Sequence, residues 1–94
     1  MIHVVVLSDL LQKKIRKRAY PEYVLKKLYA WIEDVHTNGL NEVRKRPGFH
    51  DEPLKGWLQG MRSIRLSREW RAYYVLVEEE LTFVRIERLD KHEY

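Results

Sequence analysis

Acid–base and cationic side chains follow one another in the loop HDEPLKG and just after it. The loop holds His50 and Glu52 before a proline, and Lys55 after it. Cleavage of RNA without a metal needs a base for the 2′-hydroxyl proton, cations beside the phosphate and an acid for the leaving 5′-oxygen. The residue types in this loop fit those roles. An ordinary surface loop, with Trp57 packed over it rather than stacked on a base, is the simpler alternative.

Two arginines lie in the strand-like run RSIRLSREWRAYY that follows. Ile64 and Leu66 alternate with polar residues and are expected to face the core, so Arg65 points to the opposite face. Arg71, on the next strand, is expected to share that open face. Arginine binds phosphate in a bidentate manner and lysine binds it as a point charge. The pattern therefore predicts a cationic phosphate site, with arginines kept for solubility as the alternative.

Acidic and histidine residues at both ends of this region raise the question of a metal site. The possible ligands are His50, Asp51, Glu52, Asp90, His92 and Glu93. None of them shows a recognised ligand spacing, and two nearby arginines would repel a cation. We therefore predict no metal and no cofactor, and treat His92 as a further proton-transfer group.

The elements that must position these residues form one α+β domain, predicted to span residues 1–94. Residues 2–7 are expected to form a buried strand and residues 9–17 a first helix, with Ser8 or Asp9 as cap. A second helix runs from Pro21 to Asn38 at helical spacing of apolar residues, and residues 40–45 add one turn. From Gly60 onward the period changes to two, with a turn at EEE (78–80), which predicts a three-stranded antiparallel meander. Both amino-terminal helices are expected to cover one face of this small, mainly antiparallel sheet.

Charge is concentrated in the amino-terminal half. Residues 1–50 hold ten Lys and Arg against five Asp and Glu, in a chain whose net charge is +4. The surplus of positive charge predicts binding to a polyanion. Nucleic acid is favoured over a membrane surface, because no strongly apolar amphipathic face accompanies the basic residues. The alternative is a solvated helix face. The candidate RNA- or ribosome-binding residues are Lys13, Lys14, Arg16, Lys17, Arg18, Arg44, Lys45 and Arg46.

Composition narrows the cellular setting. The chain has no cysteine, which fits a reducing cytoplasm and excludes disulfides and cysteine-based zinc sites. The first residues have neither a leading basic segment nor a cleavage motif, so no signal peptide is expected. No apolar run approaches the roughly 20 residues needed to span a bilayer.

HDEPLKG, RSIRLSREWRAYY, the preceding GLNEVRKRPGFH and the final DKHEY together resemble the RelE/ParE superfamily of bacterial type II toxins. The likeness is greatest to RelE- and HigB-type mRNA interferases, the kind called plasmid maintenance killer proteins. It covers well over half of the chain. The resemblance implies a compact α/β toxin that cleaves translated mRNA on the ribosome, without a metal, and is neutralised by a cognate antitoxin.

The resemblance also implies roles for single residues. Glu52 falls on the general base of YoeB-like members, and Lys55 on the lysine of the same motif. Arg65 and Arg71 fall on arginines that contact the scissile phosphate. HigB-like members use a histidine shortly before PLKG, which falls on His50. The general base is therefore open between His50 and Glu52.

The last residues depart from the YoeB-like pattern. There histidine and tyrosine are adjacent, whereas here Glu93 separates His92 from Tyr94. On a strand this spacing points His92 and Tyr94 the same way. The resemblance then implies His92 as general acid and Tyr94 as a residue that stacks on or orients a base.

Two other functions fit a small basic domain. A ParE-like toxin would share the fold and inhibit DNA gyrase by protein contact, but such members generally lack the cationic and proton-transfer residues found here. A non-catalytic RNA-binding module would bind RNA and leave it uncut.

Overall fold

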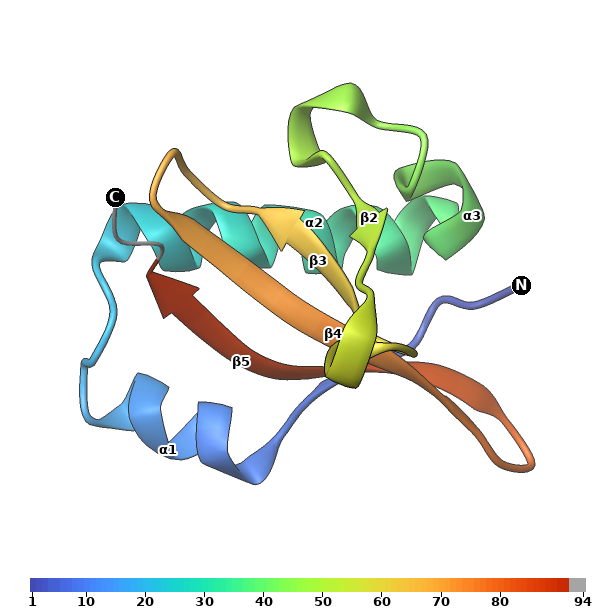
Figure 1. Cartoon of the computed structure of the whole chain (residues 1–94), viewed down its shortest axis with the longest axis horizontal. Helices are drawn as coiled ribbons and strands as arrows, with labels where there is room; N and C mark the ends of the chain where they lie inside the picture. Colours follow the sequence, from blue (N-terminus) through green and yellow to red (C-terminus); the bar gives the residue numbers. More distant parts are fainter. Residues whose placement is uncertain (92–94) are drawn as a thin grey trace.

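The sheet is organised around a long antiparallel hairpin, β4 (Trp70–Glu78) and β5 (Thr82–Lys91) (Figure 1). The computed structural model describes residues 1–91. β3 (Arg62–Arg65) pairs antiparallel with β4, and the two-residue β2 (Glu52–Pro53) pairs antiparallel with β3. β1 (Val5–Leu7) lies at the other edge, parallel to β5. The strand order is β1-β5-β4-β3-β2.

Three α-helices precede most of the sheet in the described part of the chain. They are α1 (Asp9–Arg16), α2 (Glu22–Asn38) and α3 (Leu40–Val43), and two 3-10 turns follow, η1 (Pro47–Phe49) and η2 (Gly56–Leu58). The Ser8 hydroxyl accepts a hydrogen bond from the Leu11 backbone N–H at 3.1 Å and so caps α1. Gly39 ends α2 with φ of 84°, a value that glycine adopts at little cost.

The core lies between α2 and one face of the sheet, and Figure 1 shows α2 running behind β3 and β4. The α2 side chains Val24, Leu28, Trp31 and Val35 are fully buried, as expected from their helical spacing. They meet the alternate sheet residues Ile64, Ala72, Tyr74, Val84 and Ile86. The rings of Trp31 and Tyr74 lie 5.2 Å apart between centroids. With one face of the sheet covered in this way, the other face is left for polar side chains.

The predicted α+β architecture is confirmed: two amino-terminal helices, a short extra helix and a three-stranded meander. The first strand is shorter than expected, because the Ile2 carbonyl accepts a hydrogen bond from the Leu40 N–H at 2.8 Å instead of joining the sheet. β4 runs through Glu78, one residue into the predicted EEE turn. β2 was not predicted, because two residues that include a proline carry no alternation signal.

Within residues 1–91, the structure contains no helix that is long and apolar enough to cross a membrane.

Candidate functional site

The register of the sheet places two rows of polar side chains on its open face. In the first row Glu52 of β2 pairs with Ser63 of β3, and Ser63 pairs with Tyr73 of β4. Tyr73 pairs in turn with Arg88 of β5. A second row, two residues further along, consists of Arg65, Arg71 and Asp90. Residues from four strands therefore meet on one surface, as side chains at alternate positions must.

Glu52 and Arg71 connect the two rows of this surface. An Arg71 Nη1 hydrogen donates to Glu52 Oε1 at 3.3 Å, and the same nitrogen donates to the Ser63 hydroxyl at 3.2 Å. The other carboxylate oxygen of Glu52 lies 3.8 Å from His50 Nε2. The structure thus brings His50, Glu52 and Arg71 together. Nearly half of the Glu52 side chain is exposed, so solvent or a ligand can reach it.

Asp51 fixes the segment that carries His50 and Glu52. Its side chain is fully buried, and it accepts hydrogen bonds from Arg62 Nε at 2.7 Å and from the Tyr74 hydroxyl at 2.6 Å. Burial raises the pKa of Tyr74, and the Asp51 hydrogen bond raises it further, so the phenol stays protonated and donates. Because Asp51 is held on the core side, the adjacent Glu52 faces the open side.

Arg65 and Arg71 are direct cross-strand partners on β3 and β4. Like charges at directly opposed positions repel each other and destabilise a sheet. Glu52 offsets the charge of Arg71, but Arg65 is exposed and makes no ion pair with any residue from 1 to 91. This pair of cations therefore suits an anion placed between them.

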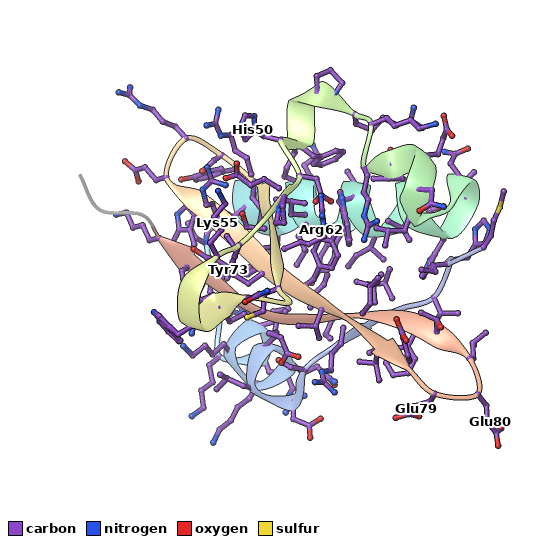
Figure 2. The ribbon with its side chains drawn as sticks, turned by 45° about the vertical axis from the view of Figure 1, so that its right-hand side comes forward. His50, Lys55, Arg62, Tyr73, Glu79 and Glu80 are labelled. Atoms are coloured by element: carbon purple, nitrogen blue, oxygen red, sulfur yellow. The ribbon has the colours of Figure 1, made fainter. Side chains whose placement is uncertain are left out.

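Lys55 and Trp57 lie in the loop after β2. Lys55 is exposed and makes no ion pair with another described residue. In Figure 2, His50 and Lys55 lie far from Glu79 and Glu80 at the tip of the β4–β5 hairpin, so the acidic tip does not screen them. Trp57 is 86% exposed, and the expectation that it packs over the loop is therefore wrong. Its free ring is available for stacking.

Four residues of the surface were not among the predicted site residues: Ser63, Tyr73, Arg88 and Asp90. Arg88 lies 5.1 Å from the Tyr73 ring centroid and forms an ion pair with Asp90 at 2.9 Å. Alternation alone puts Ser63 on the same face as Arg65, which is the sequence signal that could have found it. The positions on β5 depend on its register with β4, which contains a bulge between Tyr73 and Tyr74.

The candidate acid His92 and the candidate stacking residue Tyr94 lie outside the described residues, as does Glu93. Their roles stay predictions. In residues 1–91 no group of three or more His, Cys, Asp or Glu side chains could hold a metal ion.

The two basic runs differ in their surroundings. Lys13, Lys14, Arg16, Lys17 and Arg18 in and after α1 are all exposed and make no ion pair with a described residue. In the second run, Arg46 donates two hydrogen bonds of 3.1 Å to Asp34, and Lys45 lies 3.6 Å from Glu42. Arg44 lies near enough to the Tyr74 hydroxyl to oppose part of the rise in the pKa of that phenol. The first run is therefore the freer cationic surface of the two.

Comparison with known proteins finds structures of the same fold but no protein of similar sequence. No family model and no curated protein matches the chain. Among solved structures, YafQ from E. coli strain BL21(DE3) is similar, with a TM-score of 0.68 and 21% identity over 94% of this chain and 91% of that one. The YoeB–YefM complex from Staphylococcus aureus gives a TM-score of 0.67 and 20% identity over 97% of each chain. A YoeB/ParE toxin from Agrobacterium tumefaciens gives 0.67 and 18% over 99% of this chain and all of that one. The chain thus has the fold of these toxins.

Proposed function

We propose that this protein is the toxin of a type II toxin–antitoxin pair and that it cleaves mRNA on the ribosome without a metal. The observation that carries the proposal is the opposed pair Arg65 and Arg71 on an open sheet face, with Glu52 and His50 beside it. The fold of YafQ- and YoeB-type toxins supports it. A gyrase inhibitor acting by protein contact would not need these acid–base groups.

Arg71 changes partner when RNA binds in the mechanism that we propose. A phosphate that binds between Arg65 and Arg71 forms an ion pair with the Arg71 guanidinium. In the free protein this guanidinium lies 3.3 Å from the Glu52 carboxylate. Glu52 then loses its ion pair, and its carboxylate is left free to face the 2′-hydroxyl. The two arginines, with Lys55 from the loop, stabilise the charge that develops on the phosphate oxygens.

The bond changes follow those of metal-free RNA cleavage. The 2′-hydroxyl loses its proton to the base, and its oxygen attacks phosphorus while the bond to the 5′-oxygen breaks. The products are a 2′,3′-cyclic phosphate and a 5′-hydroxyl. The leaving 5′-oxygen takes a proton from the general acid, for which His92 is our candidate, and Tyr94 or the exposed Trp57 stacks on a neighbouring base.

We assign the base to Glu52, with His50 as a group that orients it across the 3.8 Å contact. Glu52 touches the arginine that would hold the phosphate, whereas His50 lies one group further away. Glu52→Gln should remove the acidic limb of the pH profile for single-turnover cleavage. If His50→Gln removes that limb and Glu52→Gln keeps it, His50 is the base.

Partners follow from the charge distribution and from the related structures. YafQ and YoeB are found in complexes with the antitoxins DinJ and YefM. We propose a cognate antitoxin for this chain that covers the open face and silences it in the cytoplasm. We also propose that the five cations in and after α1 contact ribosomal RNA together with Arg44. Lys45 and Arg46 contribute less because their charges are engaged within the protein.

Arg65→Ala with Arg71→Ala tests the proposal. We expect induction of the wild-type protein to arrest growth and to produce new mRNA 5′ ends only during active translation. The double variant should lower cleavage by about 10²-fold or more, because preorganised charge is lost. Arg85→Ala, an exposed arginine of β5 whose partner is Glu87, is the control and should cleave normally.

The proposal fails if a folded double variant still arrests growth and cleaves mRNA. Supercoiling by purified gyrase in the presence of the protein distinguishes the ParE-like alternative. RNA that is bound but left intact on translating ribosomes would indicate a non-catalytic binding module.

A further inference from the structure

An open hollow of about 470 Å³ adjoins the candidate site at the end of β3. Its lining consists of Lys27, Gly48, Arg65, Leu66, Ser67 and Arg68. Arg65 belongs both to this lining and to the opposed pair with Arg71. Arg65 therefore connects the hollow with the candidate site.

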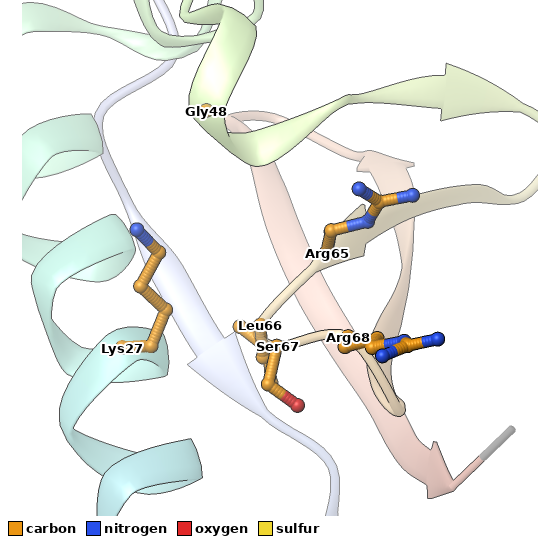
Figure 3. A pocket seen from close by; sticks show the side chains of 6 residues that line it. All are labelled: Lys27, Gly48, Arg65, Leu66, Ser67 and Arg68. Carbon is orange, nitrogen blue, oxygen red and sulfur yellow. The ribbon is translucent and has the colours of Figure 1, made fainter.

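Three of the lining residues are cationic, and none of the lining residues within 1–91 is acidic. Figure 3 shows Arg65 and Arg68 extending in the same direction from the end of β3 and the following turn, away from Lys27, which lies on α2 on the other side of Leu66 and Ser67. Lys27 Nζ also lies 4.7 Å from the centroid of the Phe49 ring, which helps to hold it there. Gathered positive charge of this kind raises the local concentration of anions.

The turn that presents Arg68 is itself held in place. The Ser67 hydroxyl accepts hydrogen bonds from the backbone N–H groups of Glu69 at 3.3 Å and Trp70 at 3.1 Å. The Leu66 N–H donates to the Trp70 carbonyl at 2.9 Å, and the Leu66 side chain is buried beneath the hollow. The backbone that carries Arg65 and Arg68 is thus held in place by hydrogen bonds, which lowers the entropic cost of binding a ligand.

Gly48 leaves the mouth of the hollow open. A Cβ added there would meet nothing within 4 Å. A larger side chain at this position would therefore leave the protein interior unchanged. Because Gly48 belongs to the lining, an acidic side chain there would add negative charge beside the hollow without touching its cations.

We propose that this hollow is an RNA subsite that binds the phosphate next to the scissile one, through Lys27, Arg65 and Arg68. The proposal rests on the proposed function, because the scissile phosphate is placed between Arg65 and Arg71. Arg65 lies between the two phosphates and fixes their spacing. Phosphates repeat along RNA, so a strand that places one phosphate at Arg71 presents the next to an adjoining cationic site.

The test uses short RNA that cannot be cleaved. The probe is a dinucleoside monophosphate carrying 2′-O-methyl groups, compared with the same compound bearing one extra phosphate at its 5′ or 3′ end. The extra phosphate at one end should tighten binding to the wild-type protein about tenfold. Lys27→Gln with Arg68→Gln should abolish that gain, and Gly48→Glu should abolish it by placing a negative charge beside the cations of the hollow.

Two control variants isolate the hollow. Lys26→Gln removes one positive charge from the residue before Lys27 on α2, which lies outside the lining, and should keep the gain. Gly48→Ala adds a methyl group into open space and should keep it as well. Circular dichroism and thermal melting of each variant confirm that it is folded.

The outcomes separate this inference from the proposed function. If Arg71→Gln leaves binding of the parent dinucleotide unchanged while the gain is lost in Lys27→Gln/Arg68→Gln, the cleavage site fails and the phosphate site in the hollow stands. A gain that survives in Lys27→Gln/Arg68→Gln, or no gain at either end, overturns the subsite. The subsite is also overturned if Lys27→Gln/Arg68→Gln loses binding to a glutamate-rich peptide but keeps the RNA gain. In that case the hollow binds an acidic segment of a partner protein.

Discussion

Asp51 and Glu52 show how two adjacent carboxylates take opposite roles. Asp51 is fully buried and binds Arg62 and Tyr74, whereas Glu52 faces the open side and binds Arg71. A buried carboxylate must have its hydrogen bonds satisfied, and the donors that satisfy it also fix the backbone on either side. The burial of Asp51 therefore determines where the Glu52 carboxylate lies.

Tyr74→Phe should destabilise the protein by about 1.5–3 kcal/mol, because it removes a 2.6 Å hydrogen bond to the buried carboxylate of Asp51 and keeps the packed ring. Urea unfolding measures the loss. Tyr73→Phe is the matched control on the same strand. It faces the open side and retains the ring beside Arg88, so its effect should stay within about 0.5 kcal/mol. Equal losses in the two variants would contradict the anchoring role of Asp51.

At the scale of elements, Asp34 joins α2 to the segment that leads into the site. It accepts hydrogen bonds of 3.1 Å from Arg46 Nε and Nη2 and one of 2.7 Å from Asn38. The Arg46 hydrogen bonds, followed by that of Asn38, hold the pKa of Asp34 below its ordinary value. Arg46 directly precedes η1, whose last residues lead to His50, so this contact links the helix to the loop of the candidate site.

The same contact should make stability depend on acid. Because the pKa of Asp34 is lower in the folded than in the unfolded protein, its stabilising effect is present above about pH 4 and is lost as pH falls through the folded value. Asp34→Asn should flatten the decline in free energy of unfolding below about pH 4. Denaturant titrations at a series of pH values measure it.

Glu33→Gln is the control for that series, because Glu33 is the exposed neighbour on α2 and its carboxylate makes no ion pair with another described residue. It should keep the wild-type acid dependence. If Asp34→Asn retains the full wild-type slope, the Asp34–Arg46 contact does not contribute to the link between α2 and the loop.

At the scale of the whole molecule, the cations of the two main proposed RNA contacts belong to different elements. One is the open sheet face with its adjoining hollow, and the other is the exposed run in and after α1. The acidic side chains Glu79 and Glu80 lie at the tip of the β4–β5 hairpin, away from His50 and Lys55 (Figure 2). This separation fits a protein that contacts ribosomal RNA on one surface and mRNA on another.

Lys13→Gln with Lys17→Gln should weaken association with ribosomes and lower its dependence on salt. Each lost RNA phosphate contact reduces the slope of log K against log salt by about 0.7, so the pair should reduce it by about 1.4. Sedimentation with ribosomes at several salt concentrations measures the slope. Lys26→Gln with Arg85→Gln removes the same charge elsewhere and should leave the slope unchanged. An unchanged slope in the α1 variant would remove this helix from the proposed ribosome contact.

The sequence by itself determined the α+β fold, the extent of α2 and the open face that carries Arg65 and Arg71. These features follow from local periodicity: helical spacing from Val24 to Val35, and alternation around Ile64 and Ala72. The sequence also indicated His50 and Glu52 as candidate proton-transfer groups, but it did not show that they contact residues of the sheet.

Only the tertiary structure decided which side chains meet. The two-residue β2 has no periodic signal, yet its pairing with β3 brings Glu52 within 3.3 Å of Arg71. The exposure of Trp57, the buried anchor at Asp51 and the hollow between Lys27 and Arg68 likewise depend on contacts between residues far apart in the sequence. Register and burial are properties of paired elements, so no pattern within a single segment encodes them.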